Sequence, residues 1–568
     1  MKNVYVAAKQ EVYEAIVVGS GMTGGWAAKE LCEKGLKTLV LEFGRNVEHG
    51  KDYIGEHVPA WDYPFNGLGD RKLYDKEYQV QSQCYAFSEA TRHFFVNDKD
   101  NPYTHDPDKP FAWIRGHQVG GKSIMWARLS YRLSDIDFKA NAKDGFGTDW
   151  PFRYKDLAPW YDYVETFAGI SGQAEGLPQL PDGKFLPPME LNCVEKSMRE
   201  RLQKSISDRV LTIGRCAVLT QPHNGRAPCH YCGPCHRGCS TGSYFSSLSA
   251  TLPAAAATGN LTLRPNSVVH SVIYNDDKDK AVGVRVIDGE TKEMIEFYGR
   301  MIFLCASTLG STRILLNSKS KRFPNGLANS SGALGHYLMD HHYRVYAEGE
   351  FEGFGNQYYS GYRPNGFYIP RFRNINNQHP DFLRGYALQG AAFREGWDRG
   401  SITPGFGAEF KRQISKPGKW KVRTNAFGEC LPNYDNYVEL DPDVKDAWGL
   451  PVLKIHFQWG ENEAAMRKDM RIASAETLEA SGAKNIVIDE KPSIPGLCIH
   501  EMGTARMGHD PKTSVLNGYN QAHDVPNLFV TDGASMPSVA CQNPSLTFMA
   551  LTARACDYAV SEMKKMHI

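Results

Sequence analysis

Length, composition and charge exclude several classes of protein at the outset. The chain has 568 residues, with 65 Lys and Arg against 64 Asp and Glu. This balance gives no electrostatic reason to expect binding to nucleic acid or to an anionic membrane surface. Hydrophobic residues make up 42%, yet no run approaches the roughly 18 uncharged apolar residues of a membrane span. We therefore expect a soluble globular protein with two or more structural domains.

The N-terminus and the cysteines bear on the cellular compartment. The first residues lack a charged segment followed by a long apolar one, so we expect no signal peptide on this chain. The thirteen cysteines are an odd number, and nine of them are scattered singly. This usage favours reduced thiols over a disulfide framework.

The N-terminal segment has the pattern of a dinucleotide-binding βαβ unit. An apolar strand at 15–18 is followed by Gly19, Gly21 and Gly24 in the spacing GxGxxG. The first glycine permits a tight turn, the second lets backbone approach a pyrophosphate, and the third lets helix pack on strand. The phosphates would lie at the N-terminus of a helix expected at 22–34, where free N–H groups favour an anion.

A second strand, expected at 37–41, delivers an acid about twenty residues beyond the glycines. This acid is Glu42, placed to accept a hydrogen bond from a ribose 2′-hydroxyl and to repel a 2′-phosphate. The alternative is a glycine turn in an ordinary βα unit, because the glycine motif alone is common. Strand, helix, second strand and acid together favour a bound dinucleotide.

The glycine pattern returns after an irregular excursion at 51–110. The stretch from Arg115 to Trp126 contains the pair Gly120 and Gly121 before a helix-like segment. Paired glycines there suggest a second close approach of backbone to the cofactor; an ordinary loop pair is the alternative.

The rest of the chain changes between helical and strand patterns. We expect helices at 195–207, 243–257, 309–316 and 545–564, and strands within 261–286, at 301–305 and at 528–531. The segment 336–493 has longer alternating stretches, such as 343–351 and 452–457, which predict an antiparallel sheet.

The order of these patterns predicts an α/β protein, α+β overall, with a discontinuous nucleotide-binding domain and an inserted sheet that supplies the substrate pocket. The nucleotide-binding domain is expected at 11–50, 111–150, 195–335 and 494–568. The substrate domain and its connecting excursions are expected at 51–110, 151–194 and 336–493.

A compact cysteine run is the second candidate site. Cys229, Cys232, Cys235 and Cys239 follow the spacing C-x2-C-x2-C-x3-C, which is typical of an iron–sulfur cluster. Zinc sites usually separate two ligand pairs by a longer loop, but zinc and a bare cysteine-rich turn stay open as alternatives. Ser240 stands where bacterial ferredoxin runs have proline, so a [3Fe-4S] and a [4Fe-4S] cluster are both expected possibilities.

Five stretches taken in order resemble the glucose-methanol-choline (GMC) oxidoreductases. They are the N-terminal GxGxxG and residues 115–121, 428–442, 500–508 and 532–544. The resemblance covers essentially the whole chain. It implies FAD as cofactor, a Rossmann-like FAD-binding domain and an inserted antiparallel-sheet substrate domain.

The resemblance also assigns residues. Family members have histidine at the position of His500 and histidine or asparagine at that of Asn543, both facing the flavin, and we predict these two as catalytic. The predicted cofactor-binding residues are Gly19, Ser20, Gly21, Gly24, Glu42, Arg115, Gly120, Gly121, Ser123, Trp126, Val269, Asp532, Gly533, Pro544 and Thr547. Members that attach FAD covalently have histidine where this chain has Met125, so the expected FAD is non-covalent.

His500 is predicted to take the proton of a secondary alcohol while the flavin accepts the hydride. Asn543 would hydrogen-bond the same hydroxyl without competing for the proton. Four other histidines lack comparable motif context and are expected to be structural: His341, His342, His509 and His523.

A cluster beside a flavin can pass electrons singly from the flavin to an external acceptor, which favours a dehydrogenase over an oxidase that reduces oxygen. The chain is similar to flavoprotein subunits of bacterial sugar dehydrogenases, and most to glucoside 3-dehydrogenases, which form 3-keto sugars. The resemblance implies a small accessory subunit and a cytochrome c or other one-electron acceptor. Because such a partner can carry the export signal, the expected location is the periplasm by co-export, or the cytoplasm. The alternatives are an oxidase or dehydrogenase of another polyol, sugar acid or alcohol, or a non-catalytic electron-transfer or binding subunit.

Overall fold

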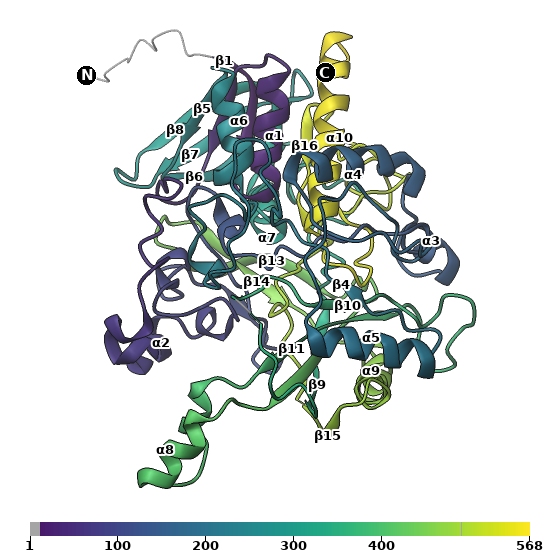
Figure 1. Cartoon of the computed structure of the whole chain (residues 1–568). Coiled ribbons are helices and arrows are strands. Elements are labelled where there is room, and N and C mark those ends of the chain that lie inside the picture. Colours follow the sequence, from purple (N-terminus) through teal and green to yellow (C-terminus); the bar gives the residue numbers. More distant parts are fainter. Residues whose placement is uncertain (1–11, 360, 490) are drawn as a thin grey trace.

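The fold is described from a computed structural model over residues 12–359, 361–489 and 491–568. In this part of the chain the strands form sheets of seven, six and three strands. Figure 1 shows the seven-stranded sheet and its helices at one end of the molecule and the six-stranded sheet at the other. None of the described helices is both long and apolar enough to cross a membrane. The N-terminal segment considered for a signal peptide lies outside the described residues, apart from its last position.

The seven-stranded sheet has the order β5-β2-β1-β8-β7-β6, with β16 also paired to β8. Its parallel strands are β1 (Val12–Val18), β2 (Thr38–Leu41), β5 (Leu261–Arg264), β8 (Met294–Leu304) and β16 (Leu528–Val530). Its antiparallel edge consists of β6 (Ser267–Asn275) and β7 (Lys280–Asp288). The sheet therefore brings together segments from the start, middle and end of the chain.

Strand β1 is apolar at consecutive positions because it is covered on both faces. Ile16 and Val18 belong to one hydrophobic cluster, while Ala15 and Val17 belong to another. Helix α1 (Met22–Glu33) packs on α6 (Leu252–Ala257) and on α10 (Ser545–Lys564), and α10 packs on α4 (Tyr154–Ala168). Helix α7 (Thr308–Asn317) follows β8.

The six-stranded sheet is antiparallel and has the order β15-β9-β12-β11-β10-β4. Its strands are β4 (Thr212–Ile213), β9 (His342–Phe351), β10 (Phe367–Ile369), β11 (Tyr386–Arg394), β12 (Trp420–Gly428) and β15 (Lys484–Ile488). Helix α9 (Glu461–Ala480) packs against β9, β12 and β15, and α5 (Cys193–Ser205) packs against α9 and β11. The sheet thus has one helix-covered face.

A small third sheet and several short elements complete the structure. The third sheet holds β3 (Thr104–His105), β13 (Tyr437–Lys445) and β14 (Pro451–His456). The remaining α-helices are α2 (Arg71–Glu77), α3 (Asp135–Asp144) and α8 (Gly407–Ser415), of which α8 projects from the body in Figure 1. The short 3-10 and π turns are η1 (Ala60–Asp62), η2 (Pro64–Gly67), η3 (Gln81–Gln83), η4 (Arg92–Phe94), η5 (Gly121–Ile124), η6 (Cys235–Arg237), η7 (Ser247–Thr251), η8 (Trp397–Ser401) and η9 (Gly533–Ser535).

The predicted α/β class with an antiparallel second sheet is confirmed. Two details differ from the expectation for 336–493. The strand expected at 452–457 is β14, which belongs to the three-stranded sheet because it pairs with β13 and with β3. Helix α9 was not expected in this segment, and only a narrow stripe of it, including Met466 and Met470, is buried. The predicted domain boundaries stay a prediction; β4, inside the segment 195–335, pairs with β10.

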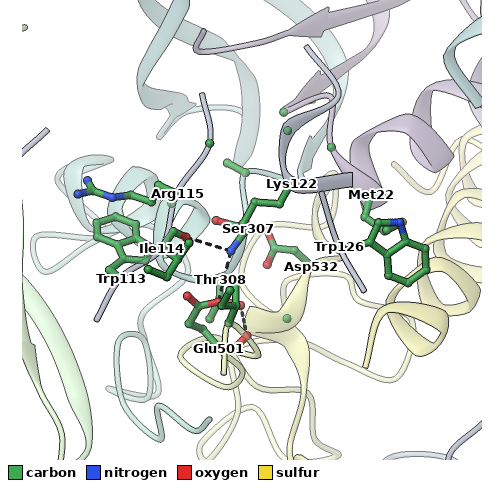
Figure 2. A pocket seen from close by; sticks show the side chains of 18 of the residues that line it. Met22, Trp113, Ile114, Arg115, Lys122, Trp126, Ser307, Thr308, Glu501 and Asp532 are labelled. Carbon is green, nitrogen blue, oxygen red and sulfur yellow. Dashed lines mark hydrogen bonds and ion pairs between the residues drawn. The ribbon is translucent and has the colours of Figure 1, made fainter. Parts of the chain in front are cut away.

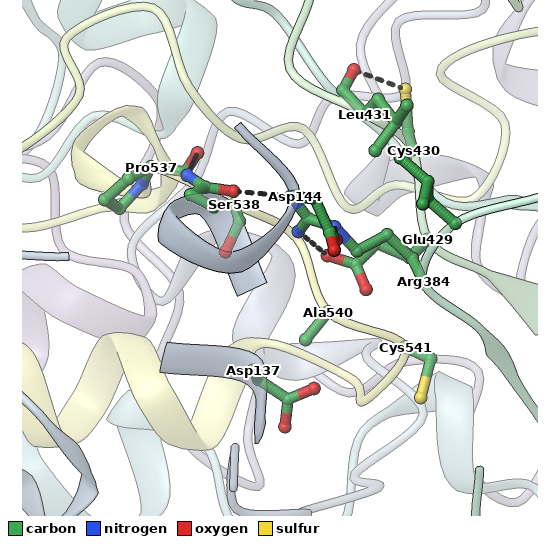
Figure 3. Close-up of polar contacts among 12 residues, drawn as sticks. Asp137, Asp144, Arg384, Glu429, Cys430, Leu431, Pro537, Ser538, Ala540 and Cys541 are labelled. Atoms are coloured by element: carbon green, nitrogen blue, oxygen red, sulfur yellow. Dashed lines mark hydrogen bonds and ion pairs between the residues drawn. The ribbon is translucent and has the colours of Figure 1, made fainter. Parts of the chain in front are cut away.

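A buried ionic network joins α3, the six-stranded sheet and the C-terminal part of the chain (Figure 3). Nη1 of Arg384 donates to Oε1 of Glu429 at 2.8 Å, and Nε lies 2.6 Å from Oδ2 of Asp144. Nη2 of Arg384 donates to Oδ1 of Asn141 at 2.9 Å, and Nδ2 of Asn141 donates to the carbonyl of Pro537 at 3.0 Å. Because Arg384 and Glu429 are almost fully buried, each charge depends on its partner.

Replacing the cation alone should therefore cost more stability than replacing the pair. We expect Arg384→Met to lower the free energy of unfolding by about 3–5 kcal/mol, because buried Glu429 loses its hydrogen-bonded cation and keeps only Arg371, 4.0 Å away. Arg384→Met combined with Glu429→Gln should recover much of this loss. Urea unfolding followed by far-UV circular dichroism measures both, and an Arg384→Met protein as stable as the parent would contradict the assignment.

Candidate functional site

A cavity of about 520 Å³ has walls from both large sheets. Figure 2 shows it from close by. Of the predicted site residues, those that line it are Gly19, Ser20, Gly21, Glu42, Arg115, Gly121, Ser123, Trp126, Val269, His500, Asp532, Gly533 and Asn543. The structure thus brings together side chains that span most of the sequence.

Four predicted cofactor residues do not line the cavity. They are Gly24, Gly120, Pro544 and Thr547. Gly24 and Gly120 lie directly behind the lining residues of the two glycine turns, as described below. Thr547 is fully buried and its Oγ1 lies 2.8 Å from the hydroxyl of Tyr161.

The first glycine turn has the geometry that its sequence predicts. Gly19 has φ +99°, and a Cβ built on Gly24 would lie 2.0 Å from the carbonyl oxygen of Gly19. A Cβ on Gly21 would meet nothing nearer than the oxygen of Gly120 at 4.0 Å. The turn is therefore closed toward the protein at Gly24 and open at Gly21, where α1 begins and free N–H groups can face an anion.

A buried carboxylate holds the two glycine turns together. Oε2 of Glu42 accepts hydrogen bonds from Oγ of Ser20 at 2.6 Å and from the Ser20 amide at 3.1 Å. Oγ of Ser20 in turn accepts from the amide of Gly120 at 3.0 Å. Burial raises the pKa of Glu42, and the hydrogen bonds from Ser20 and Gly44 oppose this. Glu42 therefore supports the turns as well as facing the cavity.

Two further serines lock the second turn in place. Oγ of Ser123 donates to the carbonyl of Gly120 at 2.5 Å and accepts from the amide of Ser247 at 3.0 Å. Oγ of Ser247 donates to the carbonyl of Ser20 at 2.8 Å. Ser247 lies in η7, so this short helix fixes the distance between the two turns.

Figure 2 shows an ionic group on the cavity wall that the sequence analysis did not predict. Nζ of Lys122 donates to the carbonyl of Ile114 at 3.3 Å and lies 3.6 Å from Oε2 of Glu501. Asp532 also faces the cavity; burial raises its pKa to about 6, opposed by hydrogen bonds from Ser311 and Ala534. No local motif marks Lys122, because its role depends on its contact with Glu501.

His500 and Asn543 also line the cavity. Burial, followed by the nearby His341 and Lys122, holds the pKa of His500 well below its usual range, so the imidazole is neutral at pH 7. Oδ1 of Asn543 accepts from Nε2 of Gln389 at 2.6 Å. Because Oδ1 already accepts this hydrogen bond, the amide N–H groups of Asn543 are the atoms that can donate to a bound molecule.

His341 lies against His500, although we expected His341 to be structural. Nδ1 of His341 is 2.8 Å from Nδ1 of His500, and Sγ of Cys498 is 3.3 Å from the same atom. Burial lowers the pKa of His341 to about 4. The two histidines are brought together by long-range pairing of the segments that carry them, for which sequence spacing provides no signal.

The loop before His500 is strained and is held by a carboxylate. Ile499, a β-branched residue, has φ +65°, a conformation that such residues rarely adopt. Oδ1 of Asp340 accepts from the amide of His500 at 3.1 Å, and Oδ2 accepts from the amide of Gly496 at 2.9 Å. Burial and the neighbouring Glu501 raise the pKa of Asp340 to about 8.

A row of polar side chains crosses the six-stranded sheet toward this end of the cavity. Gln389 of β11 pairs in register with Asn425 of β12, which pairs with Tyr346 of β9. All three residues line the cavity. Oδ1 of Asn425 is buried and has no hydrogen-bond partner within the described part of the chain. The row can offer both donors and acceptors to a hydroxylated molecule.

The four cysteines of the run line a second, small cavity. The loop is anchored to the protein on several sides. The amide of Cys229 donates to the carbonyl of Leu219 at 2.9 Å, and Nη1 of Arg237 donates to the carbonyl of Val58 at 2.6 Å. Cys232 is exposed, whereas Cys229, Cys235 and Cys239 are partly buried.

The cysteine loop is also attached to the wall of the large cavity. His236 contacts the carbonyl of Met125 through Nδ1 at 3.1 Å, and the hydroxyl of Tyr244 donates to the carbonyl of Trp126 at 2.6 Å. Met125 and Trp126 both line the large cavity. The two candidate sites are therefore separated by little more than one backbone segment.

The four cysteines can be compared with the spacing of a zinc site. A tetrahedral zinc site with Zn–S bonds of about 2.3 Å needs sulfur atoms about 3.8 Å apart. Over the residues that the structure describes, only His341, Cys498 and His500 form a set of three or more such side chains with all ligand atoms within 4.8 Å of one another. No three of the four cysteines form such a set among the described residues, so a zinc site, a cluster and a cysteine-rich turn all stay open.

Comparison with known proteins gives a family match over most of the chain. The two parts of the GMC oxidoreductase family match residues 13–343 and 432–552. The chain is 30% identical to a 2-methyl-1,2-propanediol dehydrogenase of Mycolicibacterium austroafricanum, over 96% of this chain and 94% of that one. It is 25% identical to the fructose dehydrogenase large subunit of Gluconobacter japonicus, over 97% and 98%.

The fold also matches a solved structure. A formate oxidase of Aspergillus oryzae superposes with a TM-score of 0.61 at 16% identity, over 98% of this chain and 100% of that one. The family match, the whole-length relatives and the shared fold agree with the resemblance that the motifs predict. The chain belongs to the GMC oxidoreductases, a family that acts on CH–OH groups, and has their FAD-binding fold.

Proposed function

We propose that the protein is an FAD-dependent dehydrogenase that oxidises a secondary hydroxyl of a sugar or glycoside, with C3 of glucosides as the sharpest assignment. The observation that carries the proposal is the single cavity that joins the two glycine turns to His500, Asn543 and the polar row of the substrate sheet. The fructose-oxidising relative supports a polyhydroxylated substrate. The alternative is another polyol, sugar acid or alcohol, and the diol dehydrogenase relative supports that possibility.

The residues of the cavity fit FAD. Gly21 leaves room for a pyrophosphate, because nothing lies nearer than 4.0 Å to the place where a Cβ would stand, and Glu42 lines the same cavity. When bound, the flavin supplies the hydride acceptor of the reaction. Met125 cannot form the histidyl bond of covalent members, so the FAD is proposed to be non-covalent.

His500 and Asn543 divide the work on the substrate hydroxyl. Neutral His500 takes the hydroxyl proton, which it can do at pH 7 because its pKa lies well below 6.5. Asn543 donates an amide N–H to the same oxygen and fixes its direction. Lys122, which lowers the pKa of His500, adds positive charge to the site as negative charge develops.

Electrons are proposed to leave through the cysteine run. The four thiols would hold a [3Fe-4S] or [4Fe-4S] cluster, which provides a one-electron route to an external acceptor. The contacts of His236 and Tyr244 with the carbonyls of Met125 and Trp126 support this route. A small accessory subunit and a cytochrome c are the proposed partners, with a periplasmic location by co-export or a cytoplasmic one.

Loss of the proposed base should separate cofactor binding from chemistry. We expect the His500→Ala protein to keep its FAD. Its flavin should be reduced by substrate about 10²–10⁴ times more slowly, because the proton acceptor is removed. In the parent, the reduction rate should stay constant from alkaline pH down past 6.5 and fall only in more acidic solution, where His500 is protonated. Anaerobic stopped-flow absorbance measures both.

His509→Ala is the matched control, since His509 is exposed. An unchanged rate in His500→Ala would remove the assigned base. A rate that falls as the pH drops through 6.5 itself would show that the environment does not lower the pKa of His500.

The substrate class can be tested with the polar row. We expect methyl glucosides to reduce the flavin faster than gluconate, 1,2-propanediol or a long-chain alcohol, and the product to be a 3-keto sugar by NMR. Asn425→Leu should lower kcat/KM for the glucoside about tenfold, because a substrate hydroxyl loses its partner. The same change should leave long-chain alcohols unaffected or improved. Activity confined to alcohols would end the sugar assignment.

The cluster predicts a defined metal content. Protein purified without oxygen should contain three or four iron atoms per chain with matching sulfide, and its EPR signal should change when a glucoside is added. Cys235→Ser should lose the iron, whereas Cys193→Ser, outside the run, should keep it. Zinc instead of iron would favour a zinc site, and the absence of any metal would favour a cysteine-rich turn without a metal; either result would contradict the cluster.

A further inference from the structure

The Nδ1 atom of His500 faces the protein and decides what its other ring nitrogen can do. A neutral imidazole carries one hydrogen on two nitrogens, so Nε2 accepts a proton only when Nδ1 holds that hydrogen. We propose that His341 is a positioning residue that keeps the hydrogen of His500 on Nδ1 and so leaves Nε2 as the proton acceptor. This inference rests on the proposed function, in which His500 is the base.

The assignment begins at the carbonyl of Ala540. Nε2 of His341 lies 2.9 Å from this oxygen, and a carbonyl oxygen only accepts, so Nε2 of His341 carries the hydrogen. Burial lowers the pKa of His341 to about 4, so the ring holds no second hydrogen at pH 7. Nδ1 of His341 therefore presents a lone pair.

The next contact then has only one consistent arrangement. Nδ1 of His341 and Nδ1 of His500 are 2.8 Å apart, which is a hydrogen-bond distance and needs one hydrogen between the two atoms. Since His341 has a lone pair there, His500 must donate. Nε2 of His500 is left without hydrogen, on a residue that lines the cavity.

The other arrangements leave lone pairs in contact. If His341 donated from Nδ1, its Nε2 lone pair would face the oxygen of Ala540. If the thiol of Cys498, 3.3 Å away, donated to His500, two nitrogen lone pairs would meet across 2.8 Å. Unmatched polar contacts of this kind are unfavourable in a buried site. Burial raises the pKa of Cys498 well above its usual value, so its thiol stays neutral.

The separation of the two histidine nitrogens favours a hydrogen bond over a shared metal ion. Two nitrogens bound to one tetrahedral zinc at about 2.0–2.1 Å lie about 3.4 Å apart. The observed separation of 2.8 Å between the histidine nitrogens is shorter. The contact is therefore a hydrogen bond between two neutral rings.

Backbone pairing builds this contact. Met339 and Met502 exchange two hydrogen bonds, of 2.8 and 2.9 Å, between the segments that carry the two histidines. Asp340 accepts from the amide of His500. The ionisable groups near the pair include Asp340, Lys122 and Glu501, together with Cys498 and His342. The position of His341 is therefore set by the main chain, and its side chain is available to act on His500.

The test is the tautomer of His500 in FAD-loaded protein labelled with ¹⁵N-histidine. The signals of His500 are assigned by their loss in His500→Ala. We expect a protonated Nδ1 and an unprotonated Nε2 on His500, and the reverse on His341. In His341→Phe, which keeps a ring but has no acceptor, the His500 signals should become an average of the two tautomers.

Two variants separate this role from a structural one. His341→Gln, whose amide can donate to Ala540 and accept from His500, should restore the single tautomer. Cys498→Ala should leave it unchanged. With a glucoside that reduces the flavin of the parent, His341→Phe should slow this reduction about tenfold or more. The amount of bound FAD per chain should not change, and His341→Gln should recover part of the rate.

The outcomes are distinguishable from those of the proposed function. A hydrogen on Nε2 of His500 in the parent, or a tautomer that does not change in His341→Phe, would overturn the positioning role whatever the substrate. The expected tautomers in a protein whose flavin no sugar or alcohol reduces would leave the positioning role standing and reject the dehydrogenase.

Discussion

The hydrogen bonds from Ser20 to Glu42 and from Gly120 to Ser20 are the constraint on which the rest of the site depends. They join two glycine turns that are about one hundred residues apart in sequence, and they do so with a buried carboxylate that has given up its contact with water. The second turn continues directly into Met125 and Trp126. The carbonyl of Met125 contacts His236, and the carbonyl of Trp126 accepts a hydrogen bond from the hydroxyl of Tyr244. Ser20 and Glu42 thus fix the separation of the two glycine turns in the cavity wall, and the second turn leads directly into the backbone that contacts the cysteine loop.

Local chemistry explains which parts of this arrangement could be predicted from the sequence. A glycine turn, a helix N-terminus and an acid at the end of a strand are read from spacing, because each depends on residues within about twenty positions. Gly21 and Glu42 therefore stood out, and both line the cavity, as do His500 and Asn543, which were carried by motif resemblance. Helix α9 escaped prediction because most of its surface is polar, and only a narrow stripe on the sheet marks it as helical.

The residues that could not be predicted share a different origin. Gln389, Asn425 and Tyr346 become neighbours only through the register of three strands, and a shift of one residue would turn each of them to the other face. His341 reaches His500 because Met339 pairs with Met502. Register between distant segments is a property of the folded sheet and core, so no window of sequence contains it. Two of them, His341 and Gln389, contact the proposed catalytic residues His500 and Asn543, so motif resemblance predicts that pair but not the side chains that contact it.

The supports come from the substrate side of the molecule. His341 immediately precedes β9, and Gln389 lies within β11 of the same sheet; the first contacts His500 and the second donates to Asn543. Under the proposed function, the six-stranded sheet would recognise the substrate through its polar row and would also orient the two groups that act on the hydroxyl. Gln389 would then couple substrate binding to the reaction, because it belongs to the row and contacts Asn543. A change of substrate within this fold has to keep Gln389 and His341 in place while the rest of the row varies. On that argument Asn425 and Tyr346, which make no hydrogen bond to His500 or Asn543 in the described part of the chain, are the positions where specificity can change at the lowest cost in rate.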